Sequence, residues 1–341
     1  MRKGKNSSKE AVIKGSRVNH RVLIPLYIPF EEAYYLEAFS IFEMCLNSLH
    51  NVSIYELNIT VISDGCCDAV NDKLYKLYQN NKINELIIEN DNIGKLNAIL
   101  RGLRSVNEEF VTITDADILF LENWDKSVFQ IFQTFKKAAV VSPIPVFRKQ
   151  LSYTGNIWLD SLFSKKMRFK PVKNPEALER FAKSLGWQYV EDKYKDVIMT
   201  LEENNVTAVV SAAHCVATYK ASYLKEIPKE NTIYKLGGNT EGKYLDNPPY
   251  KKDGYRLSTY NNFAYHMGNT KESWLVAIFN AQKFIKDKIV LPKIEGSEPK
   301  NKPIKNIFIK LFLKTLKIES IYDYFLLKKG LDKEKLKGFR D

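Results

Sequence analysis

Long apolar runs and cysteines at zinc-type spacing are both missing from this sequence of 341 residues. Without a run of about 18 apolar residues, we expect no helix that spans a membrane. The charged start, MRKGKNSSKE, has no apolar stretch of the kind that secretory signals contain. The four cysteines show no zinc-type spacing, and the adjacent pair Cys66-Cys67 is poorly suited to a disulfide. We therefore expect reduced thiols in a cytoplasmic protein.

The net charge of +12 is concentrated at the two ends of the chain. Residues 1–21 contain seven lysines or arginines and one acid, and residues 281–341 contain sixteen basic residues and eight acids. A nucleic-acid-binding protein usually has a basic groove in its body, and no nucleic-acid motif is present, so we expect no nucleic-acid partner. Basic ends fit an anionic membrane surface, on the inner face of the membrane, or simply aid solubility.

Short apolar segments alternate with segments of helical periodicity through the first third of the chain. This alternation predicts βαβ units and hence a parallel sheet that is covered by helices on both faces. In such sheets, ligands bind beyond the carboxyl ends of the strands. The predicted strands are 21–26, 57–63, 84–89 and 110–114, and the predicted helices are 33–49, 68–81 and 93–106. Farther along, 138–147 and 207–219 are strand-like, whereas 148–206 is predicted to be mostly helical.

Acidic residues follow two of these strands. Asp64 ends the second, and Asp115 and Asp117 follow the fourth in the sequence FVTITDAD. Two carboxylates one residue apart can share a divalent cation, and Mg²⁺ or Mn²⁺ prefers such oxygen ligands together with substrate phosphates. Aspartate is also common where a strand simply turns into a solvated loop, so this motif alone leaves both interpretations open.

Four short motifs, in this order along the chain, resemble those of one enzyme family. They are VISDGCCDAV (61–70), DNIGKLNAILRGL (91–103), TDAD (114–117) and YHMGN (265–269). Together they resemble the GT-A-fold glycosyltransferases of family 2, over roughly residues 20–270. The chain departs from the family pattern where Ser63 replaces an acid. The resemblance implies a Rossmann-like α/β fold that binds nucleotide-diphospho-sugars, with a mostly parallel sheet and helices on both faces.

The resemblance also implies roles for individual residues on the donor side. Asp64 would hydrogen-bond the nucleotide base, and Pro25 would lie near the base or ribose. Asp115 would lie near the ribose and the metal. Lys95, at a predicted helix start, could place a positive charge beside the phosphates, although an exposed helix lysine is an equal alternative.

For the metal, the resemblance implies Mn²⁺ or Mg²⁺ held by Asp117 and Asp115, with His266 completing the site. Such an ion would stabilise the negative charge on the departing nucleotide diphosphate as a Lewis acid. A histidine in an aromatic stretch is more often structural, and it is the position before Met-Gly-Asn that favours the ligand role for His266. His214, within an apolar strand, is expected to be a core or acceptor-side residue.

Transfer with inversion, also implied by the resemblance, needs a general base that takes the proton from the acceptor hydroxyl. The family places acids upstream of a Gly-Tyr-Arg stretch, which GYRLST (254–259) matches. Asp246 is our first candidate for this base and Glu241 the second. The chain departs from the family here, because Pro248-Pro249 is expected to interrupt the helix that carries these acids.

The C-terminal part combines lysines with apolar residues at helical spacing. Lys310, Lys314 and Lys317 fall on one face of a helix predicted for 304–327. Its broad apolar face would lie on an anionic membrane, dock on the catalytic domain or pair with a second copy of the chain. This face contains Ile307, Phe308, Leu311, Phe312 and Ile318. The expected organisation is a flexible basic arm (1–20), a GT-A domain (21–290) with nucleotide-binding (21–120) and acceptor (121–290) halves, a linker (291–303) and a basic amphipathic helical tail (304–341).

Taken together, the sequence predicts a metal-dependent glycosyltransferase. It would move a sugar from a nucleotide-sugar donor, UDP-linked, to a surface-glycan or lipid-linked acceptor. One alternative is a carbohydrate- or nucleotide-binding protein without catalysis. Another is a haloacid-dehalogenase-like phosphatase with Asp115 as nucleophile, although that family places its motif after the first strand. A sugar nucleotidyltransferase is disfavoured because no glycine-rich triphosphate loop follows RVLIPL.

Overall fold

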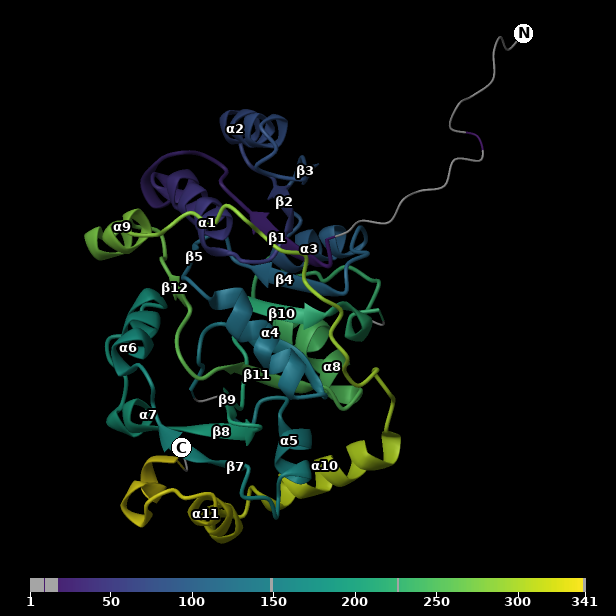
Figure 1. Ribbon diagram of the computed structural model, residues 1–341, viewed down its shortest axis with the longest axis vertical. Coiled ribbons are helices and arrows are strands. Elements are labelled where there is room, and N and C mark those ends of the chain that lie inside the picture. The colour runs from purple at the N-terminus through teal and green to yellow at the C-terminus, as the bar shows by residue number, and fades with distance from the viewer. Residues whose placement is uncertain (1–8, 10–17, 148–149, 226, 340–341) are drawn as a thin grey trace.

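The computed structural model describes residues 9, 18–147, 150–225 and 227–339 (Figure 1). Most of the predicted N-terminal arm therefore lies outside the described residues. A ten-stranded sheet runs through the molecule in the order β3-β2-β1-β4-β10-β6-β11-β9-β8-β7. A second sheet of two strands, β5 and β12, lies beside it.

The N-terminal half of the large sheet is parallel. Strands β3, β2, β1 and β4 are neighbours in that order, and each pair is parallel. The α/β class and the predicted strand-helix alternation are thereby confirmed. The strands are β1 (His20–Leu26), β2 (Asn58–Asp64), β3 (Glu85–Glu89) and β4 (Phe110–Thr114), and the helices between them are α1 (Ala38–Val52), α2 (Asp68–Gln79) and α3 (Lys95–Leu103).

From Val22 to Leu26, strand β1 is apolar because both of its faces are covered. Val22 and Ile24 pack into one core together with α1 and α4 (Trp124–Thr134), whereas Leu23 packs into a second core together with α3. Successive side chains of a strand point to opposite faces, so alternate residues of β1 serve the two cores. This arrangement leaves only the strand ends free to carry polar groups.

Beyond β4 the sheet is mixed. Strand β10 lies antiparallel between β4 and β6, and β6 pairs in parallel with β11. The remaining neighbours, β9, β8 and β7, pair in antiparallel fashion. These strands are β6 (Ala138–Ser142), β7 (Met167–Pro171), β8 (Val197–Glu203), β9 (Val206–Val209), β10 (Val216–Lys220) and β11 (Tyr255–Thr259).

The prediction that 148–206 is mostly helical was wrong in part. Helices α5 (Gly155–Asp160), α6 (Pro175–Ser184) and α7 (Asp192–Asp196) are present, but β7 and β8 form an antiparallel pair. The predicted strand 207–219 is likewise two strands, β9 and β10, with residues 210–215 between them. Both differences arise from pairing with distant strands, which local periodicity does not report.

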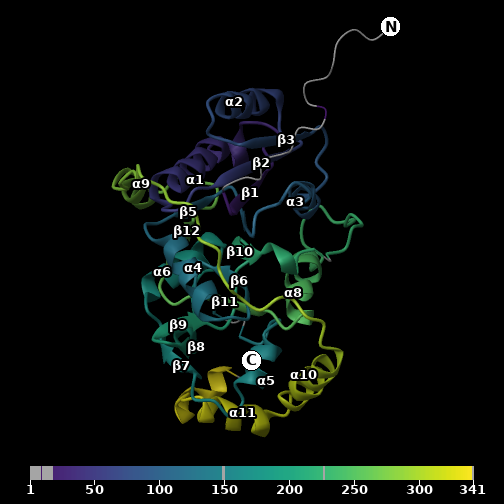
Figure 2. The same ribbon diagram turned by 45° about the vertical axis from the view of Figure 1, so that its right-hand side comes forward.

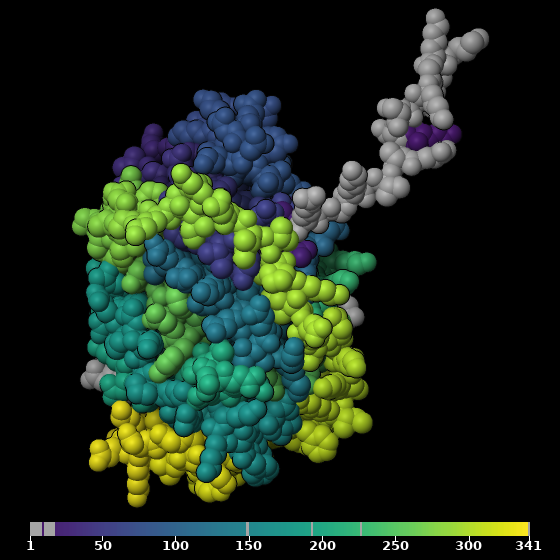
Figure 3. Space-filling model, viewed as in Figure 1, coloured from purple at the N-terminus to yellow at the C-terminus, as the bar shows by residue number. Residues whose placement is uncertain are grey.

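The C-terminal part forms two helices that pack against the rest of the molecule, α10 (Pro303–Thr315) and α11 (Glu319–Lys328), rather than one helix over 304–327. Residues 291–302 contain no helix or strand. Figures 1 and 2 show α10 beside α5, and Figure 3 shows the C-terminal residues covering one end of the molecule. Ile309 and Leu326 are buried there. Within the described residues, no helix is both long and apolar enough to cross a membrane.

Candidate active site

The two aspartates of the TDAD motif lie at the carboxyl end of β4, where the second sheet begins. Strand β5 (Ile118–Phe120) follows at once and pairs with β12 (Ala264–His266), so that His266 is opposite Ile118. The backbone amide of Met267 donates to the carbonyl of Asp117 at 2.7 Å. This pairing brings His266 Nε2 to 3.4 Å from Asp117 Oδ2, although the two residues are far apart in sequence.

The three side chains form a group that fits a divalent cation. One ligand atom each of Asp115, Asp117 and His266 lies within 4.8 Å of the others. Asp117 Oδ1 and His266 Nδ1 are buried and have no hydrogen-bond partner. Burial raises the pKa of Asp117 to about 6, with His266 opposing the rise and the Asp115 carboxylate adding to it. A buried carboxylate without a compensating donor is costly, and a bound cation would remove that cost.

A cavity of about 470 Å³ opens beside these aspartates. It is bordered by all four residues that were predicted to contact the nucleotide: Pro25, Asp64, Lys95 and Asp115. Tyr27, Tyr34 and Tyr35 form part of the same wall, and Tyr35 makes edge-to-face contacts with the other two rings. Tyrosine rings provide flat apolar surface against which a nucleotide base can stack.

The Asp64 carboxylate holds the loop between β3 and α3 in place. It accepts hydrogen bonds from the backbone amides of Ile93 at 2.7 Å and Gly94 at 3.1 Å. Burial raises the pKa of Asp64, and these two amides act in the opposite direction. Gly94 has φ 96°, and a Cβ atom there would lie 2.6 Å from Lys235 Cα, so the loop needs glycine at this position.

Lys95 connects Asp115 of the TDAD motif to Glu241 in the second half of the chain. Its ammonium lies 2.7 Å from Asp115 Oδ1 and 2.9 Å from Glu241 Oε1. Burial would lower the pKa of Lys95, but these two carboxylates outweigh it and the pKa is raised. Lys95 is therefore a fixed positive charge at the cavity, and the alternative of an exposed helix lysine was wrong.

The two candidate bases belong to a single side-chain cluster in the second half of the chain. Asp246 ends a π-helical turn (Gly242–Asp246) that leads directly into α8 (Asn247–Lys251), so Pro248-Pro249 does not interrupt the helical path. The Asp246 carboxylate lies 2.6 Å from His214 Nε2 and 2.8 Å from Arg256 Nη2. His214 Nδ1 lies 3.5 Å from Glu241 Oε2.

Two members of this cluster were not predicted as site residues. His214 was expected to be a core or acceptor-side residue; its side chain is 32% exposed and contacts Asp246 and Glu241. Arg256 is buried and also donates to the carbonyls of Ser152 and Ala212. The only sequence signal for Arg256 was its place in the Gly-Tyr-Arg stretch.

Residues 33–182 match the family described as Glycosyl transferase family 2. The chain carries a family 2 glycosyltransferase domain. The matched part of this domain contains Asp64, Lys95, Asp115 and Asp117. His266 and the cluster of His214, Glu241, Asp246 and Arg256 lie beyond it.

Curated relatives of this domain include the poly-beta-1,6-N-acetyl-D-glucosamine synthases of two staphylococci. The Staphylococcus aureus protein is 27% identical over 130 residues, 38% of this chain and 31% of that protein. The Staphylococcus epidermidis protein is 27% identical over 112 residues, 33% of this chain and 27% of that protein. The chain thus spans about a third of the length of these relatives.

Solved structures that resemble this chain include two with TM-scores below 0.5. TarS 1–349 of S. aureus in complex with UDP-GlcNAc has a TM-score of 0.43 at 15% identity, covering 79% of this chain and 68% of that one. The mannosyltransferase PcManGT of Pyrobaculum calidifontis, in complex with GDP-Man and Mn²⁺, has a TM-score of 0.41 at 16% identity, covering 72% of this chain and 55% of that one. The bound ligands are properties of those proteins.

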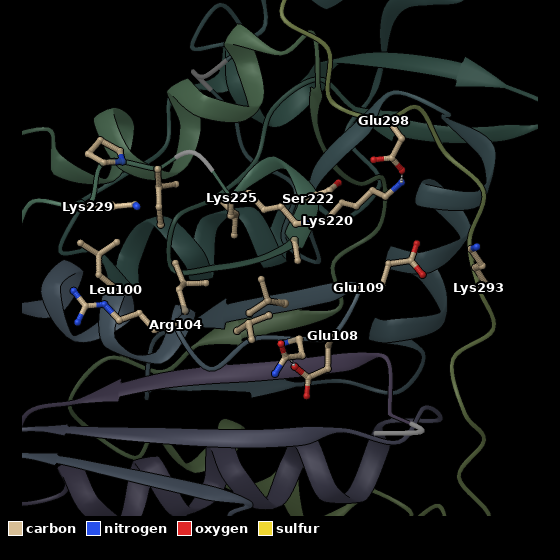
Figure 4. A pocket seen from close by; sticks show the side chains of 18 residues that line it. Leu100, Arg104, Glu108, Glu109, Lys220, Ser222, Lys225, Lys229, Lys293 and Glu298 are labelled. Atoms are coloured by element: carbon tan, nitrogen blue, oxygen red, sulfur yellow. Dashed lines mark hydrogen bonds and ion pairs between the residues drawn. The ribbon is translucent and has the colours of Figure 1, made fainter. Parts of the chain in front are cut away.

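A larger cavity of about 810 Å³ lies at the opposite end of β4 (Figure 4). Its wall includes Arg104, Lys225 and Lys229, and Lys220 there is paired with Glu298 at 3.2 Å. None of the predicted site residues borders it. Volume alone therefore does not identify the site, and the polar groups converge on the smaller cavity.

Proposed function

We propose that this protein transfers a sugar from a UDP-sugar to a hydroxyl of a surface-glycan or lipid-linked acceptor, with inversion at the anomeric carbon. The observation that carries the proposal is the position of the Asp115-Asp117-His266 group. It borders a cavity of nucleotide-binding size and is linked through Lys95 to the acidic cluster on the acceptor side. The relatives are named as synthases of an N-acetylglucosamine polymer, so UDP-N-acetylglucosamine is the first donor to test.

In this proposal, Asp115, Asp117 and His266 would hold Mn²⁺ or Mg²⁺, which would stabilise the departing diphosphate as a Lewis acid. Lys95 adds a permanent positive charge beside the diphosphate, at a position set by Asp115 and Glu241. The tyrosine wall and Pro25 border the space for the base and ribose. The cluster that contains Asp246 and Glu241 takes the proton from the acceptor hydroxyl.

The experiment is a screen of nucleotide sugars with the full-length protein, with Mn²⁺ and with EDTA. We expect release of UDP that requires the metal and increases when an acceptor glycan is added. Asp117→Asn should lose most of this release. Asp68→Asn, on the exposed side of α2, is its matched control and should keep it. UDP binding without turnover by any donor would favour the non-catalytic alternative. A phosphoaspartate on Asp115 would favour the phosphatase.

We also propose that α10 lies on an anionic membrane surface, which would suit a lipid-linked acceptor. Docking on the catalytic domain uses only one side of this helix, where Ile309 is buried and Leu313 approaches α5. The opposite side remains apolar. Ile304, Ile307, Phe308 and Leu311 are each more than half exposed and recur at helical spacing.

The charge around this face favours an anionic lipid as its partner. Lys310, Lys314 and Lys317 are all exposed beside it. An amphipathic helix with this pattern binds in the interface, with its apolar residues down and its lysines toward the headgroups. Membrane contact and docking therefore use different sides of the same helix.

Flotation with vesicles of phosphatidylglycerol and phosphatidylcholine tests this contact. We expect the wild type to float and Phe308→Glu to remain at the bottom, while Tyr75→Glu, an equally exposed aromatic residue on α2, floats as the wild type does. Flotation that is equal for the first two proteins would contradict the proposal. A dimer that Phe308→Glu disrupts in solution would assign the face to a second copy of the chain.

A further inference from the structure

Asp246, the first candidate for the general base, is not accessible to an acceptor. The residue is 1% exposed. Its carboxylate accepts a hydrogen bond from His214 Nε2 at 2.6 Å and is ion-paired with Arg256 Nη2 at 2.8 Å. A general base has to come within hydrogen-bonding distance of the proton that it removes. An acceptor hydroxyl would have to displace one of these partners to reach Asp246.

The partners of Asp246 are themselves fixed. Arg256 donates from Nη1 to the carbonyl of Ser152 at 2.9 Å and from Nη2 to that of Ala212 at 3.1 Å. Its side chain is almost fully buried, so the guanidinium cannot leave Asp246 without losing these bonds as well. The carboxylate is therefore held in one orientation, with an imidazole as its second partner.

His214, in contrast, reaches the surface of the site. Its side chain is 32% exposed, and that of Glu241 is 29% exposed. The charged groups that face the ring are Asp246 and Glu241, together with Arg256 Nη2 at 3.5 Å from Nε2. Nδ1 lies 3.5 Å from Glu241, which is longer than a hydrogen bond of normal strength. This nitrogen is on the side of the ring that faces Glu241, whose other oxygen binds Lys95 at the donor cavity.

A buried carboxylate beside one imidazole nitrogen has a known chemical consequence. It accepts the N–H of that nitrogen, fixes the tautomer and stabilises the imidazolium, so that the other nitrogen presents its lone pair to a substrate. With the Nε2 proton directed to Asp246, the lone pair of His214 is on Nδ1. The arrangement is that of an Asp-His pair rather than of a free carboxylate base.

We propose that His214 Nδ1 is the general base of the transfer and that Asp246 is its positioning residue; this rests on the glycosyltransferase function proposed above. As the acceptor oxygen bonds to the anomeric carbon, its proton moves to Nδ1. The bond from that carbon to the diphosphate oxygen breaks, and the electron pair leaves with the diphosphate. Glu241 then faces the imidazolium, and its other oxygen stays bound to Lys95.

The test compares His214→Gln, Asp246→Asn and Glu241→Gln for turnover and for binding of UDP with Mn²⁺. We expect His214→Gln to lose about 100- to 10,000-fold in kcat with unchanged UDP affinity, because the base acts only in the chemical step. His50→Gln is the matched control, since His50 bonds only the Lys82 carbonyl far from the site. It should keep wild-type turnover.

The pH dependence of kcat separates the two roles. The wild-type rate should fall at low pH as His214 becomes protonated. Asp246→Asn removes the charge that stabilises the imidazolium, so this fall should move to lower pH. Added imidazole should partly restore His214→Ala.

The proposal would be overturned if His214→Gln kept turnover within tenfold of wild type. It would also be overturned if Glu241→Gln were the one variant of the three that lost all turnover. Because Asp246 is buried, its variant is interpreted only if its melting temperature and UDP binding are retained. If they are not, the His214 variants alone test the proposal. A wild-type protein without turnover on any donor would instead contradict the function on which this inference rests.

Discussion

Asp117→Asn should stabilise the metal-free protein and at the same time remove its response to divalent cations. Burial raises the pKa of this carboxyl from 3.8 to about 6. Because the folded-state pKa is the higher one, folding favours the protonated form, and stability is lost as the pH rises from about 4 to 6. A difference of about two pKa units corresponds to roughly 3 kcal/mol above pH 6. Asparagine has nearly the same shape and carries no charge at any pH.

The assay is thermal unfolding in EDTA at pH 7.5 and at pH 5, followed by titration with Mn²⁺. In EDTA at pH 7.5, Asp117→Asn should melt roughly 3–6 °C above the wild type, and the difference should shrink at pH 5. Saturating Mn²⁺ should raise the wild-type melting temperature, because binding to the folded state stabilises it. The variant should show little change, and its transfer rate should fall about a hundredfold or more.

Two results would refute this reasoning. A variant that is less stable than the wild type in EDTA at pH 7.5 would mean that the Asp117 carboxylate has a compensating donor. A variant that keeps the full Mn²⁺ response would mean that the ion binds elsewhere. Asp68→Asn, the exposed control on α2, should change neither quantity.

Other substitutions test separate parts of the structure. Lys95→Met, compared with the exposed Lys76→Met, should lower kcat/KM about a hundredfold or more, because it removes the ammonium shared by two carboxylates at the cavity. Burial lowers the pKa of His20 to about 3, so stability should fall by up to about 5 kcal/mol as the pH drops from 6.5 toward 3, and urea unfolding of His20→Asn should lose most of this dependence. Gly155→Ala would place a Cβ 2.8 Å from Ile309, and it should cost about 1–3 kcal/mol in urea unfolding and speed proteolysis within 291–302, whereas Gly296→Ala should do neither.

The donor half could be predicted from the sequence because its signals are local. Each of the first four strands is followed within a few residues by the loop or helix that it positions. Strand ends in a parallel sheet meet at one edge, so Asp64 and Asp115 were expected to lie together, and both border the same cavity. The alternative roles of Lys95 could not be separated in this way, because its partner Glu241 comes from the other half of the chain.

The second half was harder because its strands pair across long separations. Strand β10 lies between β4 and β6, and β12 pairs with β5, which places His266 at Asp117. No periodicity within β12 reports that contact, and only the resemblance of YHMGN to a family motif pointed to it.

The C-terminal helix posed a different problem. A broad apolar face predicts burial, but the sequence does not say which stripe docks, and the structure buries Ile309 while leaving Ile307 exposed.

This difference between the halves has a functional consequence. The part that matches the family, 33–182, contains Asp64, Lys95, Asp115 and Asp117, whereas Pro25, His214, Asp246 and Arg256 lie outside it. Under the proposed function, the donor would bind at the carboxyl ends of the parallel strands, and the acceptor would bind beside the π-helical turn that ends at Asp246. Lys95 contacts both of these parts, through Asp115 and Glu241. We therefore expect changes in acceptor specificity to arise from substitutions in 183–290, with donor binding preserved as long as Lys95 keeps both partners.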